Sequence, residues 1–227
     1  MNLPRKCLAE FAGTAFLLIA VVGSGIMGER LANGNTALVL LANSTATAAA
    51  LFSLILTFAP ISAAHFNPAV SLMFAFCGEL PWATAAAYIA SQVMGATAGV
   101  AVANRMFDLP WLFVSRHARS GTGIWIGEVV ATLGLLIVVR FTAKFHPSQV
   151  AAAVASYIAG AYWFTSSTSF ANPAVTLART LSDTFAGIRP QDAVAFIAAQ
   201  VFGMLLALLF SGGLIRGEKT SPVSLHR

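Results

Sequence analysis

Long apolar runs alternate with short polar segments along this 227-residue chain. A helix needs about 20 mostly apolar residues to cross the hydrocarbon core of a bilayer. Six runs reach that length: 8–27, 37–59, 83–103, 124–143, 149–168 and 191–215. The pattern therefore predicts six membrane-spanning helices, and an even number of spans places both termini on one side of the membrane.

Two further apolar segments, 67–77 and 172–181, are too short to span. Segments of this length are typical of re-entrant or interfacial elements. Each begins with the same tripeptide, in "HFNPAVSL" (65–72) and "FANPAVTL" (170–177). We therefore expect two short helices that enter the bilayer and turn back.

The composition supports a lipid environment. The chain is 58% hydrophobic and 9% charged, whereas a soluble domain carries roughly 25% charged residues. The net charge of +5 comes from scattered Lys and Arg, which does not favour nucleic-acid binding. Because those residues are spread almost evenly over the two sides, the positive-inside rule gives little support to the cytoplasmic termini that we expect.

The sequence offers no pattern for catalysis or metal binding. Cys7 and Cys77 form no CxxC pair and belong to no Cys/His cluster, so we expect neither zinc nor a disulfide. No phosphate-binding glycine loop and no Ser/His/Asp arrangement in a polar context are present. We expect no cofactor and no enzymatic activity.

The chain repeats itself. "AEFAGTAFLL" (9–18) resembles "GEVVATLGLL" (127–136), and "AAYIASQVMGATAGV" (86–100) resembles "VAFIAAQVFGMLLAL" (194–208). Each copy holds three spans and one short segment, and an odd number of spans inverts the second copy in the membrane. This predicts two inverted repeats, 1–113 and 114–216, followed by a polar tail, 217–227.

The repeated tripeptide has a helix-start chemistry. Pro68 and Pro173 suit the first helical turn, and Asn67 and Asn172 suit the N-cap. With Ala69 and Ala174 they form two NPA motifs. Inverted symmetry would bring both helix starts, each carrying about half a positive charge, together near the bilayer midplane. Positive potential there and carboxamide donors predict a pore for neutral solutes.

These features together resemble the aquaporin family over about residues 5 to 215. The resemblance rests on the paired NPA motifs, Glu10, Glu128, "SAAHFNPAV" and the six spans. It implies an all-α membrane protein of six transmembrane helices and two re-entrant half-helices. It also implies a passive channel in the inner (plasma) membrane, assembled as a homotetramer with one pore in each subunit.

The resemblance gives Glu10 and Glu128 a supporting role, as acceptors of backbone hydrogen bonds from the two NPA loops, and His65 a bracing role in the first loop. A second interpretation is open, because acids inside a membrane are candidates for proton coupling. Gln92 and Gln200 occupy equivalent repeat positions and favour hydrogen bonds between helices over solute binding.

The family's filter positions, carried over by spacing, are Thr47, Gly160, Ser169 and Val175. Val175 stands where the family usually has Arg, and Thr47 and Gly160 stand where water-selective members have an aromatic residue and His. The expected throat is wider, less charged and more apolar. The missing arginine resembles bacterial aquaglyceroporins linked to arsenic detoxification, which implies permeation of arsenite or related neutral metalloid hydroxides, with water and polyols such as glycerol. An ordinary water or glycerol channel is the alternative.

Arg179 follows Val175 by one helical turn, about 6 Å along the axis. One hypothesis is that it lends a displaced positive charge to the outer vestibule. The other is that it simply extends to the membrane interface, as long basic side chains do.

Overall fold

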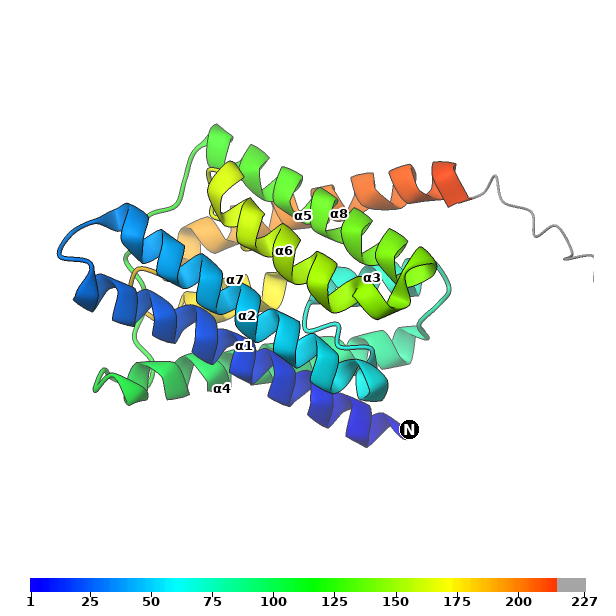
Figure 1. The fold of residues 1–227 in the computed structure, drawn as a ribbon, viewed down its shortest axis with the longest axis horizontal. Coiled ribbons are helices and arrows are strands. Elements are labelled where there is room, and N and C mark those ends of the chain that lie inside the picture. The colour runs from blue at the N-terminus through cyan, green and yellow to red at the C-terminus, as the bar shows by residue number, and fades with distance from the viewer. Residues whose placement is uncertain (216–227) are drawn as a thin grey trace, which may run out of the picture.

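The computed structural model describes residues 1–215, and every regular element in that range is helical. The polar tail predicted at 217–227 lies outside the described residues. Figure 1 shows the long helices side by side with the short helices α3 and α7 between them. The long helices are α1 (Leu3–Leu31), α2 (Thr36–Ser62), α4 (Trp82–Met106), α5 (Thr122–Phe145), α6 (Val150–Phe164) and α8 (Pro190–Ile215).

Five of these helices are long and apolar enough to cross a membrane, and α6 is shorter. The predicted helix at 149–168 is wrong at its end, because α6 stops at Phe164 after 15 residues. The hydroxyl of Thr165 then bonds to the carbonyl of Ala161 at 2.7 Å, and Thr168 takes a left-handed φ of 61°. Ser and Thr side chains that bond the backbone in this way compete with helix continuation.

The two short helices are α3 (Pro68–Phe76) and α7 (Pro173–Arg179), and a 3-10 turn, η1 (Pro147–Gln149), precedes α6. Asparagine side chains cap the starts of both short helices, Asn67 for α3 and Asn172 for α7. In Figure 1, α3 lies toward the end of the molecule that holds the N-terminus, and α7 lies toward the opposite end. Helix α1 begins and α8 ends at the same end of the molecule.

Helices α1 and α4 pack closely because glycines let their backbones approach. A Cβ atom at Gly95 would lie 2.3 Å from the carbonyl oxygen of Phe11, and one at Gly99 would lie 2.3 Å from that of Ala15. The small residues of "GATAG" therefore serve a contact within the chain. Helices α5 and α8 form the corresponding pair in the second half of the chain.

Candidate functional site

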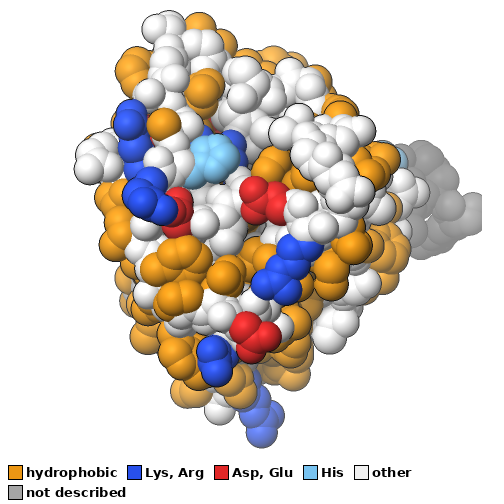
Figure 2. Space-filling view, turned by 90° about the vertical axis from the view of Figure 1, so that its left-hand side faces the viewer, with side chains coloured by type: hydrophobic (Ala, Val, Ile, Leu, Met, Phe, Trp, Pro, Cys, Tyr) orange, Lys and Arg blue, Asp and Glu red, His pale blue; other side chains and the backbone are white. Residues whose placement is uncertain are grey.

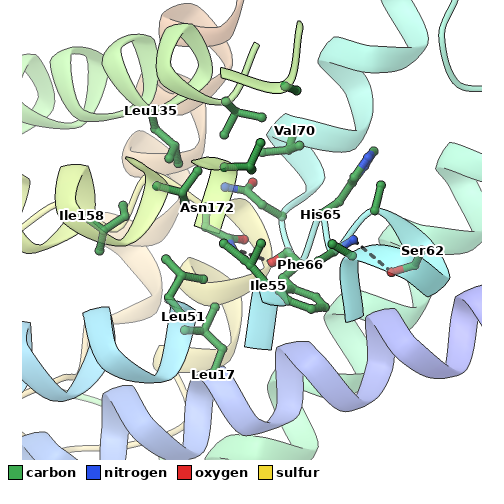
Figure 3. Close-up of a pocket in the computed structure, with 18 of the residues that line it drawn as sticks. Leu17, Leu51, Ile55, Ser62, His65, Phe66, Val70, Leu135, Ile158 and Asn172 are labelled. Atoms are coloured by element: carbon green, nitrogen blue, oxygen red, sulfur yellow. Dashed lines mark hydrogen bonds between the residues drawn. The ribbon is translucent and has the colours of Figure 1, made fainter. Parts of the chain in front are cut away.

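The two short helices meet through their capping asparagines. The Nδ2 of Asn67 donates to the carbonyl of Ala171 at 2.8 Å, and the Nδ2 of Asn172 donates to the carbonyl of Phe66 at 2.8 Å. Figure 3 shows the second of these bonds beside the cavity. The bonds are reciprocal, so each NPA loop is anchored to the backbone of the other.

In both asparagines the side-chain oxygen is occupied, whereas the side-chain nitrogen keeps one N–H group free of the bonds between the loops. Each Oδ1 is occupied as a cap, Asn67 accepting from Ala69 N at 2.9 Å and Asn172 from Ala174 N at 3.0 Å. A carboxamide carries two N–H donors, and one of each pair crosses to the opposite loop. Both asparagines line the cavity, so what they have left to offer a solute is an N–H donor.

Glu10 accepts hydrogen bonds from the first NPA loop. Its carboxylate accepts from the backbone N–H groups of His65 (2.9 Å) and Phe66 (2.7 Å), from the hydroxyl of Ser62 (2.6 Å) and from the amide of Gln92 (2.8 Å). Phe66 has a left-handed φ of 48°. A non-glycine residue in that region is strained, and the carboxylate fixes it there.

Glu128 makes the matching contacts in the second half. It accepts from the N–H groups of Phe170 (2.8 Å) and Ala171 (2.9 Å) and from the amide of Gln200 (2.7 Å). Both glutamates are fully buried, and neither lines the cavity. The two glutamines thus bond between helices rather than facing a solute.

His65 lies on the cavity wall, where Figure 3 labels it. Its Nδ1 lies 3.0 Å from the hydroxyl of Ser71, which also accepts from Gln92 at 3.0 Å. The ring packs between Phe74 and Tyr88, with centroid distances of 5.1 and 5.4 Å. His65 therefore joins the first NPA helix to the Glu10 network.

A cavity of about 540 Å³ runs along the two loops. It extends from Lys6 and Glu79, near the end that holds the N-terminus, to Thr47 and Tyr162 beyond the asparagines. Much of its wall is aliphatic, and Figure 3 labels Leu17, Leu51, Ile55, Val70, Leu135 and Ile158. An apolar wall with a few polar groups at fixed places is typical of a selective conduit.

The cavity brings together three of the four filter residues expected from spacing: Thr47, Ser169 and Val175 all line it. We call this set, with Tyr162, the throat. The hydroxyl of Tyr162 lies 3.3 Å from that of Thr47. Ser169 Oγ is buried and has no hydrogen-bond partner within residues 1–215.

Gly160, the fourth expected filter residue, is not among the residues that line this cavity. The face of α6 that lines the cavity holds Val150, Val154, Ile158 and Tyr162, at four-residue spacing. Gly160 is half a turn away from Ile158 and Tyr162, and a Cβ atom there would contact the ring of Phe164 at 3.5 Å. Counting back from Asn172 therefore misses Tyr162, and the clue available in the sequence was the stripe of apolar residues every four positions.

Arg179 is buried, with 2% of its surface exposed, so its extension to the membrane interface is ruled out. Its Nε donates to the carbonyl of Ala186. Its guanidinium carbon lies 3.3 Å from the centroid of the Phe170 ring. Arg119, which sequence reasoning did not single out, lies against the same ring at 5.1 Å.

Both arginines lie at the end of the molecule opposite the N-terminus. Figure 2 shows this end, where basic and acidic side chains lie close together around a histidine. The exposed Arg116 and the half-buried Asp183 form a 2.9 Å ion pair there. Burial lowers the pKa of Arg119 to about 10, so it stays charged at neutral pH. Burial, Arg119 and Arg179 lower the pKa of His117, which keeps that ring neutral.

The sequence matches the model of the family "Major intrinsic protein" over residues 1–144. The chain belongs to the major intrinsic protein family. It is 48% identical over 97% of both chains to "Aquaglyceroporin AqpS" of Rhizobium meliloti (strain 1021). It is 31% identical to "Aquaporin NIP1-1" of Oryza sativa subsp. japonica, over 65% of this chain and 49% of that protein.

A solved structure of the aquaglyceroporin from Plasmodium falciparum has the same fold, with a TM-score of 0.73, 21% identity and coverage of 94% of this chain and 97% of that one. The predicted fold class, an aquaporin-like all-α membrane protein, is confirmed. This major intrinsic protein is a multi-pass membrane channel that passes small solutes, and it is not an enzyme.

Proposed function

We propose that the protein is a passive channel of the inner (plasma) membrane for neutral polyhydroxyl solutes larger than water. Its solutes are polyols such as glycerol and neutral metalloid hydroxides such as arsenite, with water passing as well. The observation that carries the proposal is the throat, where Thr47, Tyr162, Ser169 and Val175 line the cavity. The ionisable side chains on the described cavity wall other than Tyr162 are Lys6, His65, Glu79 and Tyr88.

The polar groups of the path suit solutes with several hydroxyls. Asn67 and Asn172 offer N–H donors, while the hydroxyls of Thr47 and Tyr162 on the cavity wall can donate or accept. Arsenite at neutral pH is an uncharged trihydroxide, similar to glycerol in shape and hydrogen bonding. Aliphatic side chains such as Val175 then contact the rest of the solute. The "aquaglyceroporin" name of the 48% identical relative supports this solute class.

Ions are disfavoured at the asparagine pair. Two helix N-termini converge there, each with about half a positive charge, and the carboxamides offer donors but no free acceptor. A water molecule at this place accepts two hydrogen bonds, which interrupts a chain of proton hops. Among the described acids inside the helices, Glu10 and Glu128 are fully bonded to the loops, which gives no support to proton-coupled transport.

The proposal also covers the internal repeats, the side of the membrane that holds the termini, and the oligomeric state. The matching contacts of Glu10 and Glu128 support two inverted repeats, 1–113 and 114–216. Both ends of the helical body lie on one side, which we assign to the cytoplasm. The exposed apolar side chains around the helices suit lipid and the neighbouring subunits of a homotetramer.

Vesicle swelling tests the proposal. Purified protein in proteoliposomes is challenged with water, glycerol and arsenite gradients at pH 7, with and without an imposed proton gradient. We expect all three solutes to cross faster than in empty vesicles, independently of the proton gradient. Passage of water alone would overturn the proposal, passage of glycerol without arsenite would remove its metalloid part, and uptake that follows the proton gradient would make the protein a transporter.

A matched pair of variants tests whether solutes pass Thr47. Thr47→Phe narrows the throat, and Thr57→Phe adds the same ring to an exposed position of the same helix. The first should slow glycerol and arsenite more than water, and the second should change none of the three. Equal effects of both variants would place the solute path elsewhere.

A further inference from the structure

Two buried cations lie directly behind the throat. The guanidinium carbon of Arg179 lies 3.3 Å, and that of Arg119 lies 5.1 Å, from the centroid of the Phe170 ring. Phe170 is itself a lining residue of the cavity and is next to Ser169. Both charges are therefore held about one aromatic ring away from the solute path, outside its cross-section.

Neutral groups hold both guanidinium ions. Arg119 donates to the carbonyls of Gly187 (2.8 Å) and Phe185 (2.9 Å), and Arg179 donates to that of Ala186. Within residues 1–215, neither guanidinium forms a salt bridge with a carboxylate. Three successive carbonyls of the segment after α7 thus satisfy hydrogen bonds without cancelling the positive charge.

The nearby carboxylates offset only part of this charge. Glu128 accepts from Phe170 N, Ala171 N and Gln200, and its negative charge acts on both arginines. Asp192 accepts from the backbone N–H of Arg119 at 2.7 Å and pairs with the guanidinium of Arg189 at 2.7 Å. Arg119, Arg179 and Arg189 thus outnumber Glu128 and Asp192 by one charge. A partial positive field therefore remains at the throat, and a low-dielectric wall weakens it less than water would.

We propose that Arg119 and Arg179 form an off-axis charge barrier that excludes cations from a throat in which Val175 leaves room for large solutes. The inference rests on the proposed function and deepens it, since it names the groups that separate neutral solutes from ions. Because electrostatic repulsion acts over distance, the two guanidinium ions can repel a cation without projecting into the lumen. Size selection and charge selection are thereby assigned to different residues, the throat and the two arginines.

The first test compares ion flux with neutral-solute flux in the same vesicles. Arg119→Gln and Arg179→Gln, alone and together, remove the charges, and Arg119→Lys and Arg179→Lys keep them. Arg116→Gln removes an exposed cation of the same segment and serves as the matched control. We expect the Gln variants to raise proton and Na⁺ flux by on the order of tenfold, with glycerol swelling preserved, and the Lys variants and the control to stay near the wild type.

A second pair of variants leaves both arginines in place, in case their loss prevents folding. Thr168 Oγ1 lies 3.4 Å from Nη1 of Arg119, at a left-handed φ of 61° that Asp and Asn tolerate well. Thr168→Asp sets a carboxylate against the guanidinium and cancels its charge, whereas Thr168→Asn has the same shape without the charge. Ion flux should rise in the first variant and not in the second.

The two readouts separate the two claims. Swelling in glycerol reports on the proposed function, and ion flux reports on the barrier. Ion flux that stays at the wild-type level in Thr168→Asp, with glycerol swelling intact, would overturn the barrier and leave the proposed function standing. Equal increases in Thr168→Asp and Thr168→Asn would also overturn it, because a change of shape would then account for the leak.

Discussion

The hydroxyl of Tyr162 lies 3.3 Å from the hydroxyl of Thr47, so a residue of α6 and a residue of α2 are neighbours on the cavity wall. Both side chains are buried, at 4% and 3% exposure, and both line the cavity. An aromatic ring that the family spacing did not indicate therefore forms part of the wall at this level.

Removing that ring should widen the path. Tyr162→Ala is expected to admit four- and five-carbon polyols that the wild type passes slowly, at a cost of about 3–5 kcal/mol in stability for a buried aromatic residue. Tyr162→Phe keeps the size and should preserve the size limit. Swelling rates across a series of polyols give the comparison.

Gly160→Ala is the control that distinguishes a filter at residue 160, expected from family spacing, from a filter at Tyr162, which lines the cavity. A Cβ atom at Gly160 would make an ordinary contact of 3.5 Å with Phe164, away from the cavity. Permeability should be unchanged. A lower glycerol rate in Gly160→Ala together with a wild-type size limit in Tyr162→Ala would return the filter position to residue 160.

Glu10→Gln should destabilise the fold. The substitution replaces an oxygen by an NH₂ group that faces N–H donors from His65 and Phe66. Losing hydrogen bonds to a charged acceptor costs about 1.5–3 kcal/mol each. Thermal unfolding in detergent should show a clear loss for this variant. Glu29→Gln, which affects one exposed bond to Phe185 N, should change the melting temperature little, and equal shifts in both would speak against the supporting role.

Gly95→Ala should loosen the contact between α1 and α4. The new Cβ would lie 2.3 Å from the backbone carbonyl of Phe11, and backbone cannot move aside cheaply, so a cost of about 1–3 kcal/mol is expected. Gly123→Ala is the control, since no atom lies within 4 Å of a Cβ there. A melting temperature as high in Gly95→Ala as in Gly123→Ala would contradict the close packing.

The sequence was sufficient for the local features of this fold. Apolar runs located the long helices, and the Asn-Pro pairs at 67–68 and 172–173 located the starts of α3 and α7 because capping depends on neighbours in sequence. The end of α6 was misplaced, since the apolar run continues to Phe164 and the Ser/Thr residues after it can also occur in helices.

Contacts between residues far apart in the chain could not be predicted from the sequence. Nothing local to Arg119 indicates that its guanidinium reaches the carbonyls of Phe185 and Gly187. The same holds for Tyr162, whose direction depends on the rotation of α6 about its axis. Spacing carried over from the family assumes an identical rotation of this helix.

Permeability of the wild type and of Val175→Arg, measured for water, glycerol and arsenite in the same vesicle preparation, tests the wide throat most directly. We predict that the wild type passes all three. The added guanidinium should slow glycerol and arsenite by on the order of tenfold, a barrier higher by about 1.4 kcal/mol, while water is affected less. Val175→Met, similar in length but uncharged, should have a smaller effect. A wild type that passes only water, or a Val175→Arg variant that slows water as much as glycerol, would contradict the account.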